Sequence, residues 1–240
     1  MQKAKDEKNF ESQASLLTAK GKFKEALSLL DHHSPTNSLN DQVLWGKMSL
    51  YQLLNEHQRA SESLFTLKTS IDQSANQPTS LQKQILIART WWIHSSLVAL
   101  PHLPPQKVVQ ILDVYLAWIN TIQTTCPWVL RYVAFLLIAH YKSRPASQLK
   151  EVASLLSADS YLYSDPMTRL LTTIIDLDFE SASQSLDQCQ TLFQNDFVLK
   201  AMPQPLNKDF FFKNARSFVF LQYLRLHRSV LYIVYQINQF

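Results

Sequence analysis

The residues of this chain that could do chemistry are its histidines, its two cysteines and one short acidic run. The histidines stand at positions 32, 33, 57, 94, 102, 140 and 227. No two of them are spaced to place two metal ligands on one helical turn. Cys126 and Cys189 are isolated and lack a CxxC partner, so neither a zinc site nor a disulfide framework is indicated. We therefore expect hydrogen-bonded or solvated histidines, packed thiols, and no metal or cofactor.

The acidic run is Asp176, Asp178 and Glu180, within "IIDLDFES". It falls between two predicted helices, where helix capping and compensation of the helix dipole account for carboxylates. The chain has only two glycines, Gly21 and Gly46, far below the usual ~7%. Phosphate-binding loops and nucleophile turns need glycine. An enzyme, or a small-molecule substrate, is therefore not expected.

Ten prolines divide the chain into helix-sized segments, because proline breaks a helix interior. We expect one helix in each of 79–100, 106–126, 128–144 and 146–165, and two in each of 36–77, 167–202 and 206–240. Thr79 with Gln82 can form a capping box, and Asp165 before Pro166 is a second helix start. No alternating run with a hairpin turn occurs. The fold class is predicted to be all-α.

The longest apolar run is "WVLRYVAFLLIAHY", 128–141. Arg131 interrupts it, and it is well short of the ~18 uncharged residues that a membrane span needs. We predict a buried helix and no membrane contact. The charged start, "MQKAKDEKNFESQ", lacks the apolar centre of a secretory signal, so a cytoplasmic location is expected.

An Ala-x3-Leu pattern recurs along the chain. Its members are Ala26 with Leu30, Ala60 with Leu64, and Ala182 with Leu186. The first two alanines are 34 residues apart, the period of tetratricopeptide helix pairs, in which a small residue lets helices approach closely. Gly21 then closes the preceding helix in the left-handed conformation. The alternative is coincidence, since alanine and leucine are common in any helix.

Several longer phrases are more specific than this period. They are "LWGKMSLYQLL", "LKTSID", "RTWWIHSSL", "INTIQTTCPWVLRYV", "SYLYSDPMT", "FESASQSLDQCQTLFQNDFVL" and "NARSFVFLQYLRLH". Together, from about Gly21 to about His227, the chain resembles the e-subunit family of eukaryotic translation initiation factor 3, within the PCI-domain proteins.

That resemblance implies a right-handed superhelical stack of helical hairpins, similar to tetratricopeptide and HEAT repeats, followed by a winged helix. It implies a non-catalytic scaffold that binds the other PCI subunits of the factor and the small ribosomal subunit during mRNA recruitment. Residues 1–205 would be the helical-repeat part, and 206–240 the helices that lead towards the winged helix. By comparison with that family, we expect the further N-terminal region to be absent and the winged helix to be missing or only begun at the end of this chain. The segment "KAMPQPLNKDFFFKN" is expected to be a surface loop.

The net charge of +4 lies entirely in residues 206–240. Its basic residues are Lys208, Lys213, Arg216, Arg225 and Arg228. All but Lys208 fall within one half of a helix, which predicts a contact with ribosomal RNA, mRNA or an acidic partner. The alternative is an ordinary solvated face.

Trp91 and Trp92 are neighbours, so a helix cannot bury both on one side. Trp92 shares a face with apolar residues and is assigned to the core. Trp91 is predicted to contact another subunit, where tryptophan is enriched; a second ridge between helices is the alternative.

Two other functions remain open at this point. One is an equivalent PCI scaffold in the proteasome lid or the COP9 signalosome. The other is a separate tetratricopeptide-like adaptor that binds peptides, although the fading of the repeat after residue 70 disfavours it.

Overall fold

The computed structural model describes residues 2–32, 41–74 and 82–226. Within these ranges every regular element is helical, which confirms the predicted all-α class. Cα packing divides the chain into two compact units, Met1–Leu103 and Pro104–Phe240. In the described residues, no helix has the length and apolar content that crossing a membrane requires.

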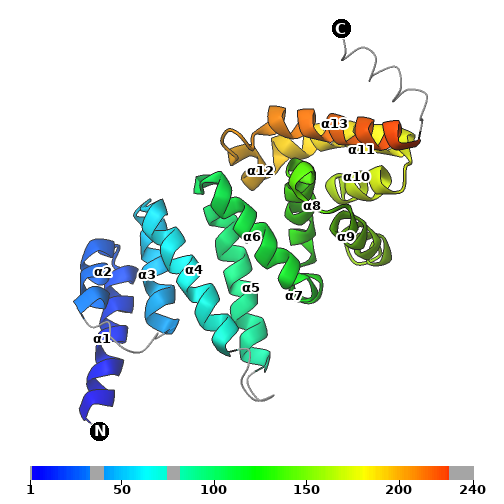
Figure 1. Cartoon of the computed structure of the whole chain (residues 1–240). Coiled ribbons are helices and arrows are strands. Elements are labelled where there is room, and N and C mark those ends of the chain that lie inside the picture. Colours follow the sequence, from blue (N-terminus) through cyan, green and yellow to red (C-terminus); the bar gives the residue numbers. More distant parts are fainter. Residues whose placement is uncertain (1, 33–40, 75–81, 227–240) are drawn as a thin grey trace. The chain divides into compact units, whose positions relative to one another are not determined.

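The first unit is a series of helices in which each packs against the next in sequence (Figure 1). The helices are α1 (Gln2–Ala19), α2 (Phe23–His32), α3 (Asp41–Leu53), α4 (His57–Ser74) and α5 (Gln82–Ala99), followed by the 3₁₀ turn η2 (Leu100–His102). The closest pairings are the hairpins α1–α2 and α3–α4, with α5 against α4. These are the helical hairpins that the repeat predicts.

Three hairpins share one turn geometry. Gly21, Asn55 and Leu177 have φ of 74°, 58° and 65°, and each stands two residues before the next helix begins. In each turn, the backbone N–H groups of this residue and of the one after it bond back to the carbonyls of the last helical turn. This is the Schellman ending of a helix. The predicted role of Gly21 is therefore confirmed.

The alanines of the repeat lie at equivalent places after these turns. Ala26, Ala60 and Ala182 are each the fourth residue of their helix, namely α2, α4 and α11 (Phe179–Asn195), and all three are buried. Gly46 in α3 serves a related purpose, because a Cβ there would lie 3.2 Å from Cδ1 of Leu30. Small residues therefore allow neighbouring helices to approach closely.

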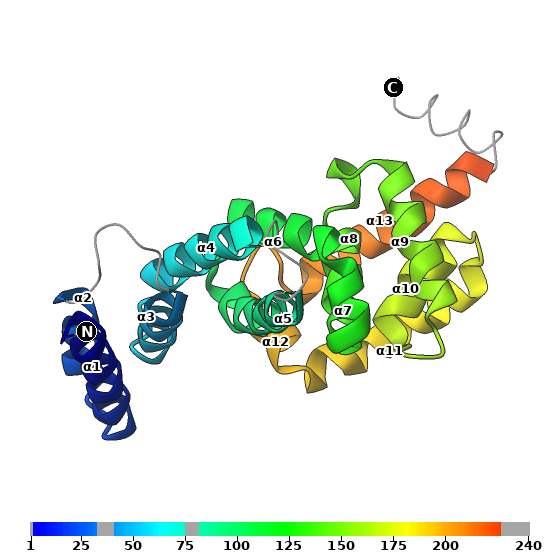
Figure 2. The ribbon, with the colours of Figure 1, turned by 90° about the horizontal axis from the view of Figure 1, so that it is seen from below.

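In the second unit, other helices pack around one buried helix, α8 (Leu130–Ala139). Residues 132–139 are all buried, as the apolar run predicts, and α8 packs against α6 (Pro105–Ala117), α10 (Pro166–Ile175) and α13 (Lys208–Leu226) (Figure 2). The remaining elements are α7 (Ile119–Thr125), η3 (Pro127–Val129), η4 (Tyr141–Ser143), α9 (Ala146–Ala158), α11 and α12 (Phe197–Ala201). Asp165 caps α10 ahead of Pro166, as predicted.

Three sequence predictions need correction. The segment 106–126 holds two helices, because the backbone leaves helical geometry at Trp118 (φ −107°, ψ 24°). The segment 167–202 holds three helices rather than two, since Asp196 ends α11 and caps α12. The predicted loop at 200–214 is mostly helix: α13 begins at Lys208, and the Phe211 and Phe212 side chains are buried.

The predicted capping residue Thr79 and the second helix expected in 206–240 lie outside the described residues. The boundary predicted between residues 205 and 206 stays a prediction.

Candidate functional site: a basic groove beside helix α13

The predicted basic residues lie at different places on α13. Lys208 is its first residue, with Nζ 5.9 Å from the ring centroid of Phe212. Lys213 and Arg216 are exposed. Arg225 is also exposed, and its Nη1 donates to Oε1 of Gln222 at 3.3 Å. Arg228 lies outside the described residues.

The structure does not bring these cations together on one face. Nine residues separate Arg216 from Arg225, which at 3.6 residues per turn places them on roughly opposite sides of the helix. The predicted packing face is confirmed, since Phe211, Phe212 and Phe218 are buried. Arg225 lies at the margin of that packed face, whereas Lys213 and Arg216 point outwards. Residues that share one half of a helix can therefore still lie on opposite edges of that half, and these cations do not form one compact basic surface.

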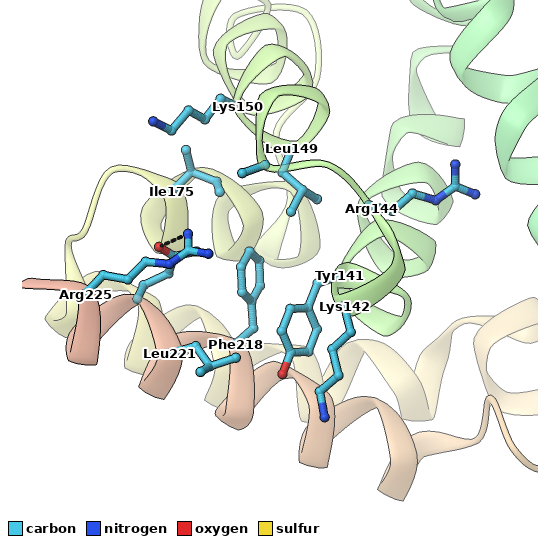
Figure 3. Close-up of a pocket in the computed structure, with 11 residues that line it drawn as sticks. Tyr141, Lys142, Arg144, Leu149, Lys150, Ile175, Phe218, Leu221 and Arg225 are labelled. Carbon is cyan, nitrogen blue, oxygen red and sulfur yellow. Dashed lines mark hydrogen bonds between the residues drawn. The ribbon is translucent and has the colours of Figure 1, made fainter. Parts of the chain in front are cut away.

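Arg225 instead lines a groove with residues from three other elements (Figure 3). The groove has a volume of about 320 Å³ and lies between η4, α9, α10 and the C-terminal half of α13. Its lining residues are Tyr141, Lys142, Arg144, Ala146, Leu149, Lys150, Ile175, Phe218, Leu221, Gln222 and Arg225. Figure 3 shows the charged side chains at the margin and the rings of Tyr141 and Phe218 between them.

The margin of the groove is basic. Four cations line it, namely Lys142, Arg144, Lys150 and Arg225, and none of the described lining residues is acidic. Arg144 is held in place, because its Nη1 lies 2.5 Å from Oδ1 of Asp113 and its side chain is only 10% exposed. The other three side chains are exposed, and within the described ranges no carboxylate pairs with them. The groove therefore presents uncompensated positive charge.

The floor of the groove is apolar. The rings of Tyr141 and Phe218 stack on each other with centroids 4.6 Å apart, and both side chains are buried. Burial raises the pKa of the Tyr141 hydroxyl, so the phenol stays neutral at physiological pH. Leu149, Ile175 and Leu221 complete the apolar lining. The site offers hydrophobic burial at its centre and anion binding around it.

The groove lacks an arrangement suited to catalysis among its described residues. Beside it, burial lowers the pKa of His140, with a further contribution from the nearby Arg144 charge, so this imidazole is neutral at pH 7. In the described part of the chain, no three His, Cys, Asp or Glu side chains group as a metal site would require. The described residues of the groove offer a ligand apolar contact and positive charge.

Sequence reasoning missed Lys142, Arg144 and Lys150. They stand in "HYKSRPASQLK", more than 70 residues before Arg225, in a part of the chain where acidic and basic residues balance. The available signal was the local excess of cations in this phrase. These cations line one surface only because Tyr141 of η4 stacks on Phe218 of α13 and α10 packs against both α9 and α13.

In the first unit, the tryptophan pair divides as predicted. Trp92 is fully buried, and its Nε1 donates to the Leu64 carbonyl at 2.7 Å. Trp91 is 64% exposed, on a ridge of α5 with Ile87 and Val98, which are also exposed. This exposure fits the predicted subunit contact, and that role stays a prediction.

The second unit also contains a polar network in which a partly buried Arg131 joins two buried carboxylates. Its Nε donates to Oδ2 of Asp165 at 2.5 Å, and its Nη1 donates to Oδ2 of Asp196 at 2.7 Å. Tyr163 and Tyr132 each donate a hydroxyl to one of these carboxylates, at 2.9 Å. The second oxygen of each carboxylate caps a helix, α10 or α12. The network has a structural role: its two carboxylates cap the starts of α10 and α12, and the other three members hold those carboxylates in place.

These five residues come from the phrases that carry the family resemblance, "IQTTCPWVLRY", "YSDP" and "FQNDFVL". Part of each phrase therefore serves to join α8 to the starts of α10 and α12. Their spacing gave no signal of this, because Arg131, Asp165 and Asp196 are widely separated in sequence.

Together, the fold and the groove define an all-α protein built from helical hairpins, with surfaces suited to binding. No protein-family model matches the chain. Among curated proteins, it is 32% identical over 200 residues to the e-subunit of eukaryotic translation initiation factor 3 from Bombyx mori. It is 34% identical over 199 residues to that of Culex quinquefasciatus, and 34% identical over 218 residues to that of Drosophila ananassae.

These alignments cover 82–88% of the chain and 43–48% of the relatives. The chain is therefore homologous to the e-subunit of eukaryotic translation initiation factor 3 over most of its own length, which confirms the predicted resemblance. It spans about half the length of the curated relatives it matches.

Proposed function

We propose that the chain is a non-catalytic scaffold within eukaryotic translation initiation factor 3, bound by neighbouring subunits through its helical surfaces. The observation that carries this proposal is the identity of 32–34% to e-subunit proteins across 82–88% of the chain. The fold supports it, because helical hairpins stacked in series expose long faces for partners. In this role the protein is cytoplasmic and supports assembly of the factor on the small ribosomal subunit.

The test is co-purification. The natural protein containing this chain is tagged, isolated from cells under mild salt, and its partners are identified by mass spectrometry beside an untagged control. We expect other subunits of the initiation factor together with proteins of the small ribosomal subunit. Recovery with the proteasome lid or the COP9 signalosome would assign the chain to one of those scaffolds, and recovery without folded partners would contradict the proposal.

The outward cations of α13 are part of this proposal. Lys213 and Arg216 are exposed one turn apart, close to the helix start at Lys208. In this proposal they bind ribosomal RNA by neutralising phosphates. Reversing both charges should weaken association with small ribosomal subunits and lower its dependence on salt by roughly two phosphate contacts. Weakened binding to another subunit, with ribosome binding unchanged, would assign this face to an acidic partner instead.

A further inference from the structure

We propose that the groove between η4, α9, α10 and α13 binds an acidic peptide segment of a partner protein, one that carries a large apolar side chain flanked by aspartate or glutamate. This inference concerns a separate surface from the outward cations of α13, and it holds whether or not the chain is part of the initiation factor.

The acidic character of the ligand follows from the charges at the margin. Lys142, Lys150 and Arg225 are exposed, and the only carboxylate that pairs with a groove cation in the described residues is Asp113, on Arg144. Like charges gathered around one hollow repel one another and raise the affinity for an anion placed between them. Figure 3 shows Arg225 and Lys150 at the same margin of the groove, on α13 and α9, with Ile175 between them, so a single bound segment can meet both.

We infer the apolar side chain of the ligand from the apolar residues at the floor of the groove. Leu221 is 41% exposed although it lies beside the buried Phe218, and Ile175 and Leu149 line the same hollow. A volume of about 320 Å³ accommodates a side chain the size of leucine or phenylalanine. Burying such a side chain against the floor is favourable because it removes apolar surface from water, and the flanking carboxylates then fix its orientation. The apolar floor therefore supplies binding affinity, and the basic margin selects peptides that carry acidic residues.

The same floor disfavours RNA as the occupant. Single-stranded nucleic acid is held largely by stacking of bases on exposed aromatic faces. Here Tyr141 and Phe218 stack on each other, and they are only 6% and 2% exposed. They offer a base no open face, and a sugar-phosphate backbone would leave the aliphatic lining unused.

The experiment measures fluorescence anisotropy of a labelled twelve-residue peptide, with one Leu-Phe pair flanked on both sides by Glu and Asp, against the purified protein. Two control peptides separate the electrostatic from the apolar contribution to binding. One has Gln and Asn in place of the acidic residues, and the other has Ser-Ser in place of Leu-Phe. We expect the full peptide to bind at least tenfold more tightly than either control. A labelled oligouridine of twelve nucleotides tests the nucleic-acid alternative.

Two matched protein variants locate the binding. The groove variant carries Lys150→Glu and Arg225→Glu, and the control variant carries Lys213→Glu and Arg216→Glu, so both change the net charge equally. All four side chains are exposed, so circular dichroism and the melting temperature should match wild type. We expect the groove variant to lose at least tenfold in affinity for the acidic peptide, and the control variant to stay within about twofold.

Several outcomes overturn the proposal. Failure of wild type to bind the acidic peptide, or equal loss in both variants, would mean that the groove is not its site. Oligouridine binding that drops only in the groove variant would assign the groove to RNA. A dimer seen by light scattering that dissociates only in the groove variant would assign it to a second copy of the chain.

Discussion

Leu177 holds the same backbone conformation as Gly21, with φ of 65° against 74°, at the same place in its hairpin turn. A left-handed conformation costs a residue with a Cβ about 1–2 kcal/mol, and glycine almost nothing. The hairpin therefore requires this conformation even at Leu177, where it is unfavourable, because the second helix must run back along the first.

We expect Leu177→Gly to raise the free energy of unfolding by about 1 kcal/mol, since it relieves the left-handed strain at a partly exposed side chain. The reverse change, Gly21→Ala, should lower it by about 1 kcal/mol. Nothing lies within 4 Å of a Cβ at Gly21, so the effect would come from the backbone alone. Urea unfolding measures both; a Leu177→Gly variant less stable than wild type would contradict the assigned strain.

Arg131→Met should destabilise the protein by about 3–5 kcal/mol, because it leaves the buried carboxylates of Asp165 and Asp196 without their cation. Adding Asp165→Asn and Asp196→Asn should recover much of this loss, because asparagine can still cap α10 and α12. Urea unfolding of the single and triple variants checks this. A triple variant no more stable than Arg131→Met would show that the lost cation is not the cause.

Stability should fall as the pH rises from 9 to 12, in part because of Cys189. Burial, assisted by the nearby Asp165 charge, raises the pKa of this thiol to about 12 from an ordinary 9.0. Between these values the unfolded thiol loses its proton while the native thiol keeps it, so each pH unit removes about 1.4 kcal/mol. Cys189→Ala should flatten the slope between pH 9 and 10, as measured by urea midpoints.

Tyr132→Phe is the comparison for that experiment. Burial and the bond to Asp196 raise the pKa of Tyr132 above its ordinary 10.0, so its contribution to the slope begins only above pH 10. We expect Tyr132→Phe to change the profile above pH 10 and to leave the range from 9 to 10 as in wild type. Identical profiles for Cys189→Ala and wild type would contradict the raised thiol pKa.

Substituting Trp91 and Trp92 separately compares the effect of an exposed ring with that of a buried ring on stability and on subunit binding. Trp91→Ala should change the free energy of unfolding by less than about 0.5 kcal/mol, because the ring is largely exposed, and should weaken binding to other subunits. Trp92→Ala should cost about 3–5 kcal/mol, because it empties a buried site. Unfolding and co-purification are measured for both. Loss of folding in Trp91→Ala would favour a ridge between helices.

Local residue chemistry predicts much of this fold. Pro166 after Asp165 located a helix start, the apolar run around Arg131 located the buried helix, and the spacing of Ala26 and Ala60 located two hairpins. Each of these signals lies within a few residues of the feature it predicts, because helices are set by local periodicity and capping.

The misses have a different physical origin. Leu177 occupies a left-handed position that local rules assign to glycine or asparagine, so tertiary packing overrode local preference there. The groove was missed because Lys150 and Arg225 line one surface only after α10 packs against both α9 and α13. Likewise, nothing local links Arg131 to Asp196. In this chain, short-range patterns define the elements, and long-range packing defines the surfaces.

The position of Arg131 also affects how the second unit opens. In a chain of stacked hairpins, each pair contacts only its neighbours, so terminal pairs can fray one at a time. Here the Arg131 guanidinium on α8 bonds to the carboxylates at the starts of α10 and α12. Neither helix can separate from α8 without leaving a buried carboxylate unpaired. Amide hydrogens in these three helices should therefore exchange together, in a single cooperative step, while the α1–α2 hairpin exchanges earlier and by itself.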